Sequence, residues 1–229
     1  MRPIRKGVLA AVALATVMAA PASARIIEIG ATAQRQVPSC PTNPCQAVSR
    51  TTGYQARAGA ARNVMVAPAD GKVVAWTISL GKPRPKQIRF FDENYGGASQ
   101  AGISVLRSGT KLFRRVVGHS PLQSLQPYFG HTVQFPLDRA LTVRKGYRIA
   151  LTVPSWAPAL ALGMGDDSSW RASRSPAQCD EPGTQTAQLD LADLTRYRCL
   201  YRTARLTYTA TLITTPTPPK PPKAASRRG

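Results

Sequence analysis

The stretch KVVAWTISL (72–80) decides the fold, because its large apolar residues recur at every second position. One face of an extended chain would carry Val74, Trp76, Ile78 and Leu80. The residues between them are small or hydroxylated. A period of two is typical of a β-strand with one face against a core, so we expect Trp76 to be buried.

The same alternation recurs at 147–153 and 204–214. The first of these segments follows Arg144-Lys145-Gly146, a turn whose glycine can adopt positive φ, and a short strand at 140–143 precedes the turn. Asp70-Gly71 predicts a hairpin turn that joins 72–80 to a strand at 64–67. Weaker strand candidates are 87–91, 102–107, 112–117, 131–135 and 159–164.

Many short strands and no convincing helical period favour an all-β fold. The chain has 229 residues with 20 Pro and 17 Gly, which is typical of a strand-and-turn protein. We expect an antiparallel β-sandwich of jelly-roll type, a single domain over residues 25–214. Only 186–195 could hold a helical turn or two. The Pro- and Lys-rich residues 215–229 predict a disordered tail.

Residues 1–24 have the three parts of a secretory signal peptide. A basic start precedes an apolar run at 8–20, and Ala22-Ser23-Ala24 is a small-x-small cleavage site. The apolar run is shorter than the about 20 residues that a membrane span needs. We therefore expect a secreted protein, extracellular or associated with the cell wall, with no transmembrane segment in the mature chain.

The four cysteines are expected to form disulfides, because an exported chain meets an oxidising environment. Cys40–Cys45 and Cys179–Cys199 are the favoured pairs, since each is local and lies in a turn-rich segment; two other pairings are formally open. Such loops contribute about 2 and about 3 kcal/mol in the chain-entropy model. A zinc site is disfavoured, since the Cys-x-x-Cys spacing is missing.

Three segments also carry a resemblance. They are CQAVSRTTGYQ (45–55), VAPADGKVVAWTISLGKP (66–83) and FPLDRALTVRKGYRIALTVPSWAPAL (135–160). Together they resemble uncharacterised exported β-sandwich proteins of high-GC soil bacteria. The third is similar to the late hairpin of jelly-roll domains, including carbohydrate-binding modules. The resemblance implies fold and compartment, and it assigns no catalytic residue.

The charge is strongly positive. Lys and Arg number 31 against 11 Asp and Glu, a formal net charge of +20. Removing 1–24 takes away three cations and no acid, which leaves +17, and the four cations of the tail leave +13 on the body. Such a field attracts anionic cell-wall polymer or glycan. A coding bias towards Arg is the alternative explanation. No DNA-binding motif is present, so we expect no specific nucleic-acid partner.

Two tryptophans are the candidate ligand-binding rings. Trp156 and Trp170 lie in predicted loops or strand ends, where an exposed ring can stack on a sugar; a buried lid over the end of the sandwich is the alternative. Arg171, Arg144 and Lys145 are the neighbouring cations expected to contact an anionic ligand.

Acidic residues offer two further interpretations. Asp92, Glu93 and Asn94 supply three oxygen donors in a row and form a weak calcium candidate, although the ordered spacing of a calcium loop is missing. A hydrolase would need convergent carboxylates, and Asp92-Glu93 or Asp166-Asp167 are the available pairs.

The chain is therefore expected to be a secreted, non-catalytic module that associates with an anionic cell-envelope polymer or glycan, without a cofactor. No nucleophile elbow, phosphate loop or zinc-protease motif is present. His119 and His131 are expected to lie at strand ends without a catalytic role. One alternative is a structural or protein-interaction domain with no small ligand, and another is a hydrolase that uses loop carboxylates.

The mature chain is expected to begin at Arg25, because cleavage follows Ala24. Intact-mass measurement of the protein recovered from the culture medium checks this. A secreted species that still carries Met1 would contradict the assignment.

Overall fold

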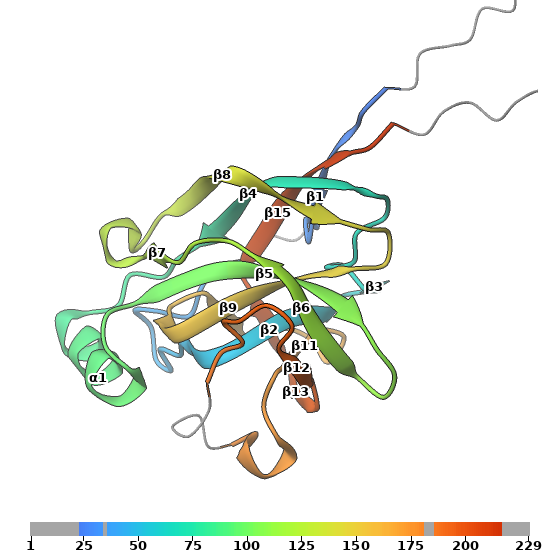
Figure 1. The fold of residues 1–229 in the computed structure, drawn as a ribbon. Coiled ribbons are helices and arrows are strands. Elements are labelled where there is room, and N and C mark those ends of the chain that lie inside the picture. The colour runs from blue at the N-terminus through green and yellow to red at the C-terminus, as the bar shows by residue number, and fades with distance from the viewer. Residues whose placement is uncertain (1–22, 34–35, 181–185, 217–229) are drawn as a thin grey trace, which may run out of the picture. The chain divides into compact units, whose positions relative to one another are not determined.

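The structure is a computed structural model that describes residues 23–33, 36–180 and 186–216. The signal peptide expected at 1–24 and the tail expected at 215–229 lie almost wholly outside these residues. Within them, two antiparallel β-sheets pack face to face, with one α-helix beside them (Figure 1). The all-β sandwich predicted from the alternating pattern is confirmed.

The smaller sheet, called sheet A, has four strands. In spatial order they are β1 (Ile26–Ile29), β15 (Tyr208–Thr214), β4 (Gly71–Ser79) and β8 (Thr132–Val143), and all pairs are antiparallel. The first and last strands of the described chain are therefore neighbours.

The larger sheet, sheet B, contains the central strands of the fold. In spatial order its strands are β12 (Leu194–Arg196), β6 (Phe113–His119), β5 (Gln100–Ser108), β9 (Arg148–Ala157), β2 (Val48–Ala58), β11 (Ser169–Ala172) and β13 (Cys199–Arg202). The short strands β3 (Ala61–Arg62) and β7 (Gln123–Ser124) pair with β2 and β5.

Smaller elements close the ends of the sandwich. They are the paired strands β10 (Leu160–Leu162) and β14 (Ala204–Leu206), the helix α1 (Pro85–Tyr95), and the 3-10 helices η1 (Gln126–Tyr128) and η2 (Pro176–Gln178). Gln55 of β2 holds β14 in place, because its side-chain amide donates to the Ala204 carbonyl and its oxygen accepts from the Leu206 N–H.

The core side of β4 follows the predicted pattern with one interruption. Trp76 is fully buried, as expected, and its ring centroid lies 4.9 Å from that of Phe135. At the other end of the strand, however, Val73 rather than Val74 is buried. The register with β8 shifts between Val73 and Ala75, and such a bulge reverses which side chain faces the core.

The middle of sheet B is buried on both faces. Ile149, Ala150, Leu151 and Val153 of β9 all have no exposed surface, although the alternation predicted a strand with only one face against a core. Sheet A covers one face. Residues 186–198 cross the other, and in this segment the Tyr197 ring lies 5.3 Å from Tyr54 of β2.

Two predicted hairpins are wrong. Segment 140–143 belongs to β8 in sheet A, whereas the strand after the Arg144-Lys145-Gly146 turn is β9 in sheet B, so this turn carries the chain from one sheet to the other. The positive φ of Gly146 is confirmed, at 87°. Residues 64–67 form no strand and make only the isolated bridge from Val66 to Arg148, so Asp70-Gly71 does not join two paired strands.

Three segments differ in type from the prediction. Residues 87–91 lie in α1: Pro85 is at its first position, and the Arg84 N–H donates to Gln87 Oε1 at 2.7 Å, which caps the helix. Residues 186–195 form turns and the start of β12, with no helix. The segment 204–214 divides at Thr207 into β14 and β15, which belong to different sheets.

Gly53→Ala is expected to lower the free energy of unfolding by about 1–3 kcal/mol, because overpacking strains a close-packed core. A Cβ at Gly53 would lie 2.9 Å from the Trp170 ring and 3.1 Å from the Arg171 carbonyl. Gly118→Ala is the control, since its nearest atoms would be 3.9 Å away. Urea denaturation measures both variants, and equal effects would contradict this packing.

Candidate functional site

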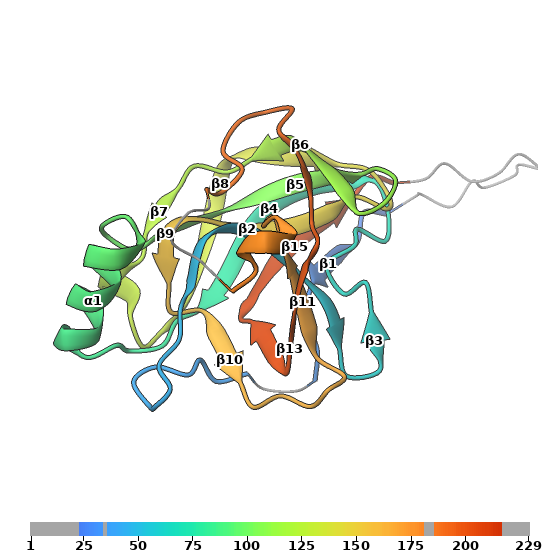
Figure 2. The ribbon, with the colours of Figure 1, turned by 90° about the horizontal axis from the view of Figure 1, so that it is seen from below.

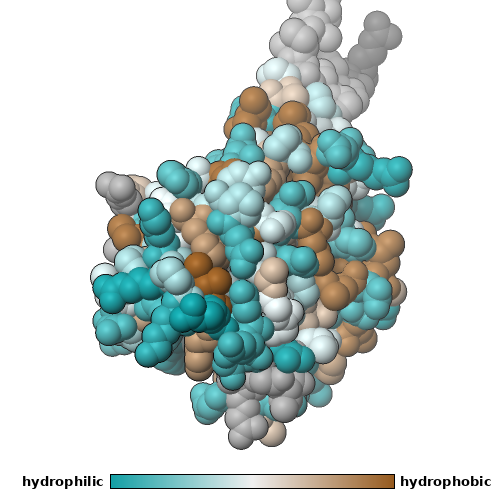
Figure 3. Space-filling view, turned by 90° about the vertical axis from the view of Figure 1, so that its left-hand side faces the viewer, coloured by the Kyte–Doolittle hydropathy of each residue, from teal (hydrophilic) through white to brown (hydrophobic). Residues whose placement is uncertain are grey.

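The largest cleft with aromatic walls has a volume of about 840 Å³ and is called the aromatic cleft here. Its lining residues come from α1, β10, β11 and β13 and from the start of β2, elements whose arrangement Figure 2 shows. On the face that carries α1, hydrophilic side chains surround scattered hydrophobic ones (Figure 3). The aromatic side chains that line the cleft are Phe90, Phe91, Tyr95, Trp170 and Tyr201.

Trp170 and Tyr201 form one wall of the cleft. They are register partners on β11 and β13, and their rings stack with centroids 4.4 Å apart and planes at 25°. Trp170 is only 3% exposed, so it is a wall of the cleft and not an open stacking platform. Its indole N–H has no hydrogen-bond partner among the described residues, which leaves a donor free in a buried wall.

Arg174 places a buried positive charge in the same wall. Its guanidinium carbon lies 5.7 Å from the centre of the Tyr201 ring, and Nη1 donates to the Tyr201 hydroxyl at 2.7 Å. Nη2 donates to the Ser49 carbonyl. Nε is buried and has no partner in the described part of the chain. These two hydrogen bonds end on neutral oxygens, so neither of them supplies a counter-ion for the charge of Arg174.

The charge balance of the cleft is positive. Arg202, which is exposed on β13, lines it together with Arg174, and Asp180 is the carboxylate among the described lining residues. A carboxylate or phosphate of a ligand would complement the two guanidinium groups.

Both disulfides are formed as predicted and both border this cleft. Cys40 is bonded to Cys45, and Cys179 is bonded to Cys199. Cys45 and Cys179 are lining residues. Each bridge therefore fixes a chain segment that lines the cleft.

Trp156 lies in the core behind the cleft and not in an exposed loop. It has no exposed surface and packs against Phe91, with ring centroids 4.8 Å apart. Its indole N–H donates to Asp92 Oδ1 at 2.8 Å and to the Gly97 carbonyl at 3.0 Å. Its role is to hold the end of α1 against β9, so the buried alternative is the correct one.

The side chains of the calcium candidate do not converge on one point in the structure. Asp92, Glu93 and Asn94 lie in the last turn of α1, where successive side chains point about 100° apart. Asp92 accepts the indole N–H of Trp156, and Asn94 donates to the Phe90 carbonyl at 2.7 Å. Within the described ranges, no group of three or more His, Cys, Asp or Glu side chains could hold a metal ion.

The structure separates the predicted cations from the cleft. Arg144 and Lys145 precede the Arg148 end of β9, whereas the cleft lies near its other end, beside Val48 and Ser49. Arg171 follows Trp170 on β11 and so points to the opposite face. There its Nη1 donates to the carbonyls of Tyr197 and Arg198, at 3.3 and 3.4 Å.

Sequence reasoning missed six aromatic or cationic residues of the cleft: Phe90, Phe91, Tyr95, Arg174, Tyr201 and Arg202. A signal was present in YRCLYR (197–202), which combines rings and guanidinium groups with a cysteine. Residues 87–91 were interpreted as a strand, which hid the aromatic face of α1.

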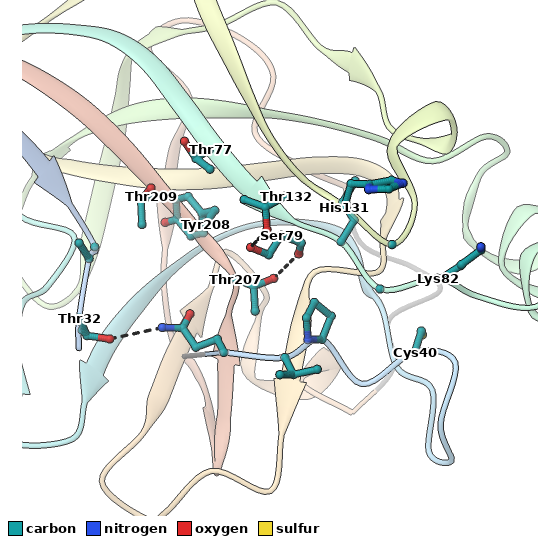
Figure 4. Close-up of a pocket in the computed structure, with 18 residues that line it drawn as sticks. Thr32, Cys40, Thr77, Ser79, Lys82, His131, Thr132, Thr207, Tyr208 and Thr209 are labelled. Carbon is teal, nitrogen blue, oxygen red and sulfur yellow. Dashed lines mark hydrogen bonds between the residues drawn. The ribbon is translucent and has the colours of Figure 1, made fainter. Parts of the chain in front are cut away.

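A second cleft, of about 540 Å³, is lined by several hydroxyl groups together with glycines and apolar side chains (Figure 4). Ser79 and Thr132 share a hydrogen bond of 2.7 Å, and the Thr207 hydroxyl donates to the Ser79 carbonyl at 2.6 Å. Lys82 and His131 lie at one end. Several of these hydroxyls thus already bond within the protein.

Comparison with protein-family models, with curated proteins and with solved structures finds no match for this chain. Among the described residues, no helix is long and apolar enough to cross a membrane.

Asp92→Ala is expected to lower the free energy of unfolding by about 1 kcal/mol, because the buried indole N–H of Trp156 loses an acceptor. Asp92→Asn keeps an acceptor oxygen and is the control with a smaller effect. Chemical denaturation measures both.

Calcium is expected to leave the melting temperature of the wild-type protein unchanged, because Asp92 is already engaged. A calcium-dependent rise that Asp92→Asn abolishes would restore the metal site.

Proposed function

We propose that the protein is an exported, non-catalytic β-sandwich module whose aromatic cleft binds an anionic glycan of the cell envelope. The observation that carries the proposal is the wall formed by Trp170, Tyr201 and Arg174. Among the described residues it combines aromatic rings, two buried N–H groups without partners and a guanidinium whose hydrogen bonds end on neutral oxygens.

The charge of the cleft favours an anionic ligand. Arg174 is 5% exposed, and a buried guanidinium gains most from a ligand that supplies the missing negative charge. Arg202 adds a second cation at the solvent side. The excess of cations over acids in the whole chain adds a long-range attraction that accelerates encounter with a polyanion.

The rings favour a sugar over a bare anion. Phe90 is 52% exposed and lines the cleft with Tyr95 and Tyr201, which are partly exposed. The C–H face of a pyranose packs on such rings, while its hydroxyls and acid group bond to polar atoms nearby. A volume of about 840 Å³ is in the range of small-molecule sites and accommodates a few sugar units.

The acids of the cleft support binding without hydrolysis. Glycosidases use two carboxyl groups that flank the scissile bond, and Asp180 is a single carboxylate among the described lining residues. Asp166 and Asp167 belong to the turn between β10 and β11 and are not among those lining residues.

Two single variants test the cleft without disturbing the core. Phe90→Ala removes an exposed ring, and Arg202→Gln removes an exposed charge. We expect the first to weaken binding about threefold to tenfold and the second about tenfold. The measurement is retention on immobilised polygalacturonate and on acidic cell-wall polymer, with neutral dextran as the reference, over a series of salt concentrations.

Arg198→Gln is the matched control for charge, since Arg198 is exposed and is not among the cleft's lining residues. It should retain wild-type binding apart from a small long-range effect. Equal losses in Arg198→Gln and Arg202→Gln would show that binding follows net charge alone and would overturn the site.

Trp170→Phe tests the unpartnered donor directly. The ring stack on Tyr201 remains, and no hydrogen bond within the described protein is lost, so the melting temperature should change little. A ligand that accepts from the indole N–H should bind several-fold more weakly to this variant. Unchanged affinity would remove Trp170 from the binding contacts.

A further inference from the structure

A second surface, which combines apolar and cationic side chains, lies at the free edge of sheet B. In the described part of the chain, strand β12 is the outermost strand of this sheet and pairs with β6, with Leu194 opposite Arg115 and Arg196 opposite Phe113. Opposite residues of an antiparallel pair share a face, and so do alternate residues of one strand. Phe113, Arg115, Leu194 and Arg196 therefore lie together on the outward side of this edge.

Large apolar side chains are exposed along this edge. Leu191 is 61% exposed, Leu194 is 51% exposed, and Phe113 and Val117 are each 37% exposed. Hydrogen bonds between the Ala192 N–H and the Val116 carbonyl, and between the Val116 N–H and the Asp193 carbonyl, fix the Leu191 turn against β6. We call Phe113, Val117, Leu191 and Leu194 the edge leucine patch. Single exposed apolar residues are ordinary, but a contiguous group marks an interaction surface.

Cations border the edge leucine patch. Arg107 and Arg115 line a hollow with Phe113 and Leu194. The Arg196 guanidinium lies 5.9 Å from the Phe113 ring centre, and its Nε donates to the Lys111 carbonyl.

Two acids also lie in this segment. Asp193 accepts the Asp190 N–H at 3.1 Å and thereby forms the turn. The net charge of the border is therefore positive. Its two carboxylates are outnumbered by four cations, which are Arg107, Lys111, Arg115 and Arg196.

The charge decides which occupant fits this surface. A second copy of the chain would bring the same positive border and the same large net charge, so self-association through the patch is opposed by repulsion. An anionic bilayer satisfies both features at once. Its headgroups pair with the cations, and its acyl region takes the leucines out of water.

We propose that the edge leucine patch is a peripheral membrane-docking surface. Arg107, Lys111, Arg115 and Arg196 contact anionic phospholipid headgroups, and Leu191 and Leu194 insert between them. This surface is separate from the aromatic cleft and does not depend on the glycan proposal.

Sedimentation with vesicles tests the proposal. The mature protein should sediment with vesicles of phosphatidylcholine and phosphatidylglycerol and stay in solution with phosphatidylcholine alone. The double variant Leu191→Ser, Leu194→Ser should have a vesicle partition coefficient at least about tenfold lower than that of the wild type. The reason is that it loses the apolar contribution to binding. Its melting temperature should not fall, since both side chains are exposed.

Matched controls separate the patch from general effects. Ile26→Ser, Ile213→Ser removes two exposed aliphatic residues that are register partners in sheet A, and should bind like the wild type. Arg107→Gln, Lys111→Gln should weaken binding several-fold more than Lys86→Gln, Arg89→Gln, which removes the same charge from α1.

Three results would overturn the proposal. They are failure of the wild type to sediment with anionic vesicles, wild-type binding by the Leu191, Leu194 variant, and equal loss in the two charge variants. Phe90→Ala and Arg202→Gln, which test glycan binding, should leave vesicle binding unchanged, so either proposal can fail alone.

Discussion

Burial of sheet B on both faces is the constraint on which the other features depend. The central residues of β9 are buried on both faces, with Ile149, Leu151 and Val153 on one face and Ala150 and Thr152 on the other. Sheet A alone therefore cannot remove them from water. The segment 186–198 supplies the second cover. The Cys179–Cys199 bridge and the β12–β6 pairing hold it across the sheet. The aromatic cleft lies beside that bridge, and the edge leucine patch lies where the segment turns over the edge of the sheet. The edge leucine patch is therefore a product of how the second face is covered, whereas the Trp170 and Tyr201 wall of the cleft lies on the other face of sheet B.

The sequence predicts the strand content well and the path of the chain poorly. A period of two reports one apolar face, and it correctly places Trp76 in the core. It carries no information about which sheet a strand joins, so the chain's passage between sheets at Arg144-Lys145-Gly146 could not be foreseen. The bulge at Val74 and the break at Thr207 depend on contacts with strands distant in sequence. The disulfide pairing could be predicted because short loops restrict which cysteines can pair.

The candidate site shows a similar division. Residue type predicted the kinds of side chain at the site, and tryptophan and arginine do line the cleft. It did not predict which tryptophans and arginines these are. Trp156 stands between two prolines and resembles a loop residue, whereas long-range packing against Phe91 buries it. Arginine burial was also unexpected. Arg205 is 2% exposed, donates to Gly30 O and to Thr32, and has its pKa lowered by burial. An excess of arginine thus serves partly as internal support for carbonyl groups and not only as surface charge.

The pairing of β1 with β15 has a topological consequence. Ile26 is opposite Ile213, the Arg25 N–H donates to the Thr214 hydroxyl, and the Thr214 N–H donates to the Arg25 carbonyl. The chain therefore enters and leaves the sandwich at adjacent positions of sheet A. A covalent link of a few residues would turn the fold into a ring, and new ends could be opened at a surface turn without breaking sheet A. A domain fused before β1 and one fused after β15 would therefore both be attached at the same corner of sheet A.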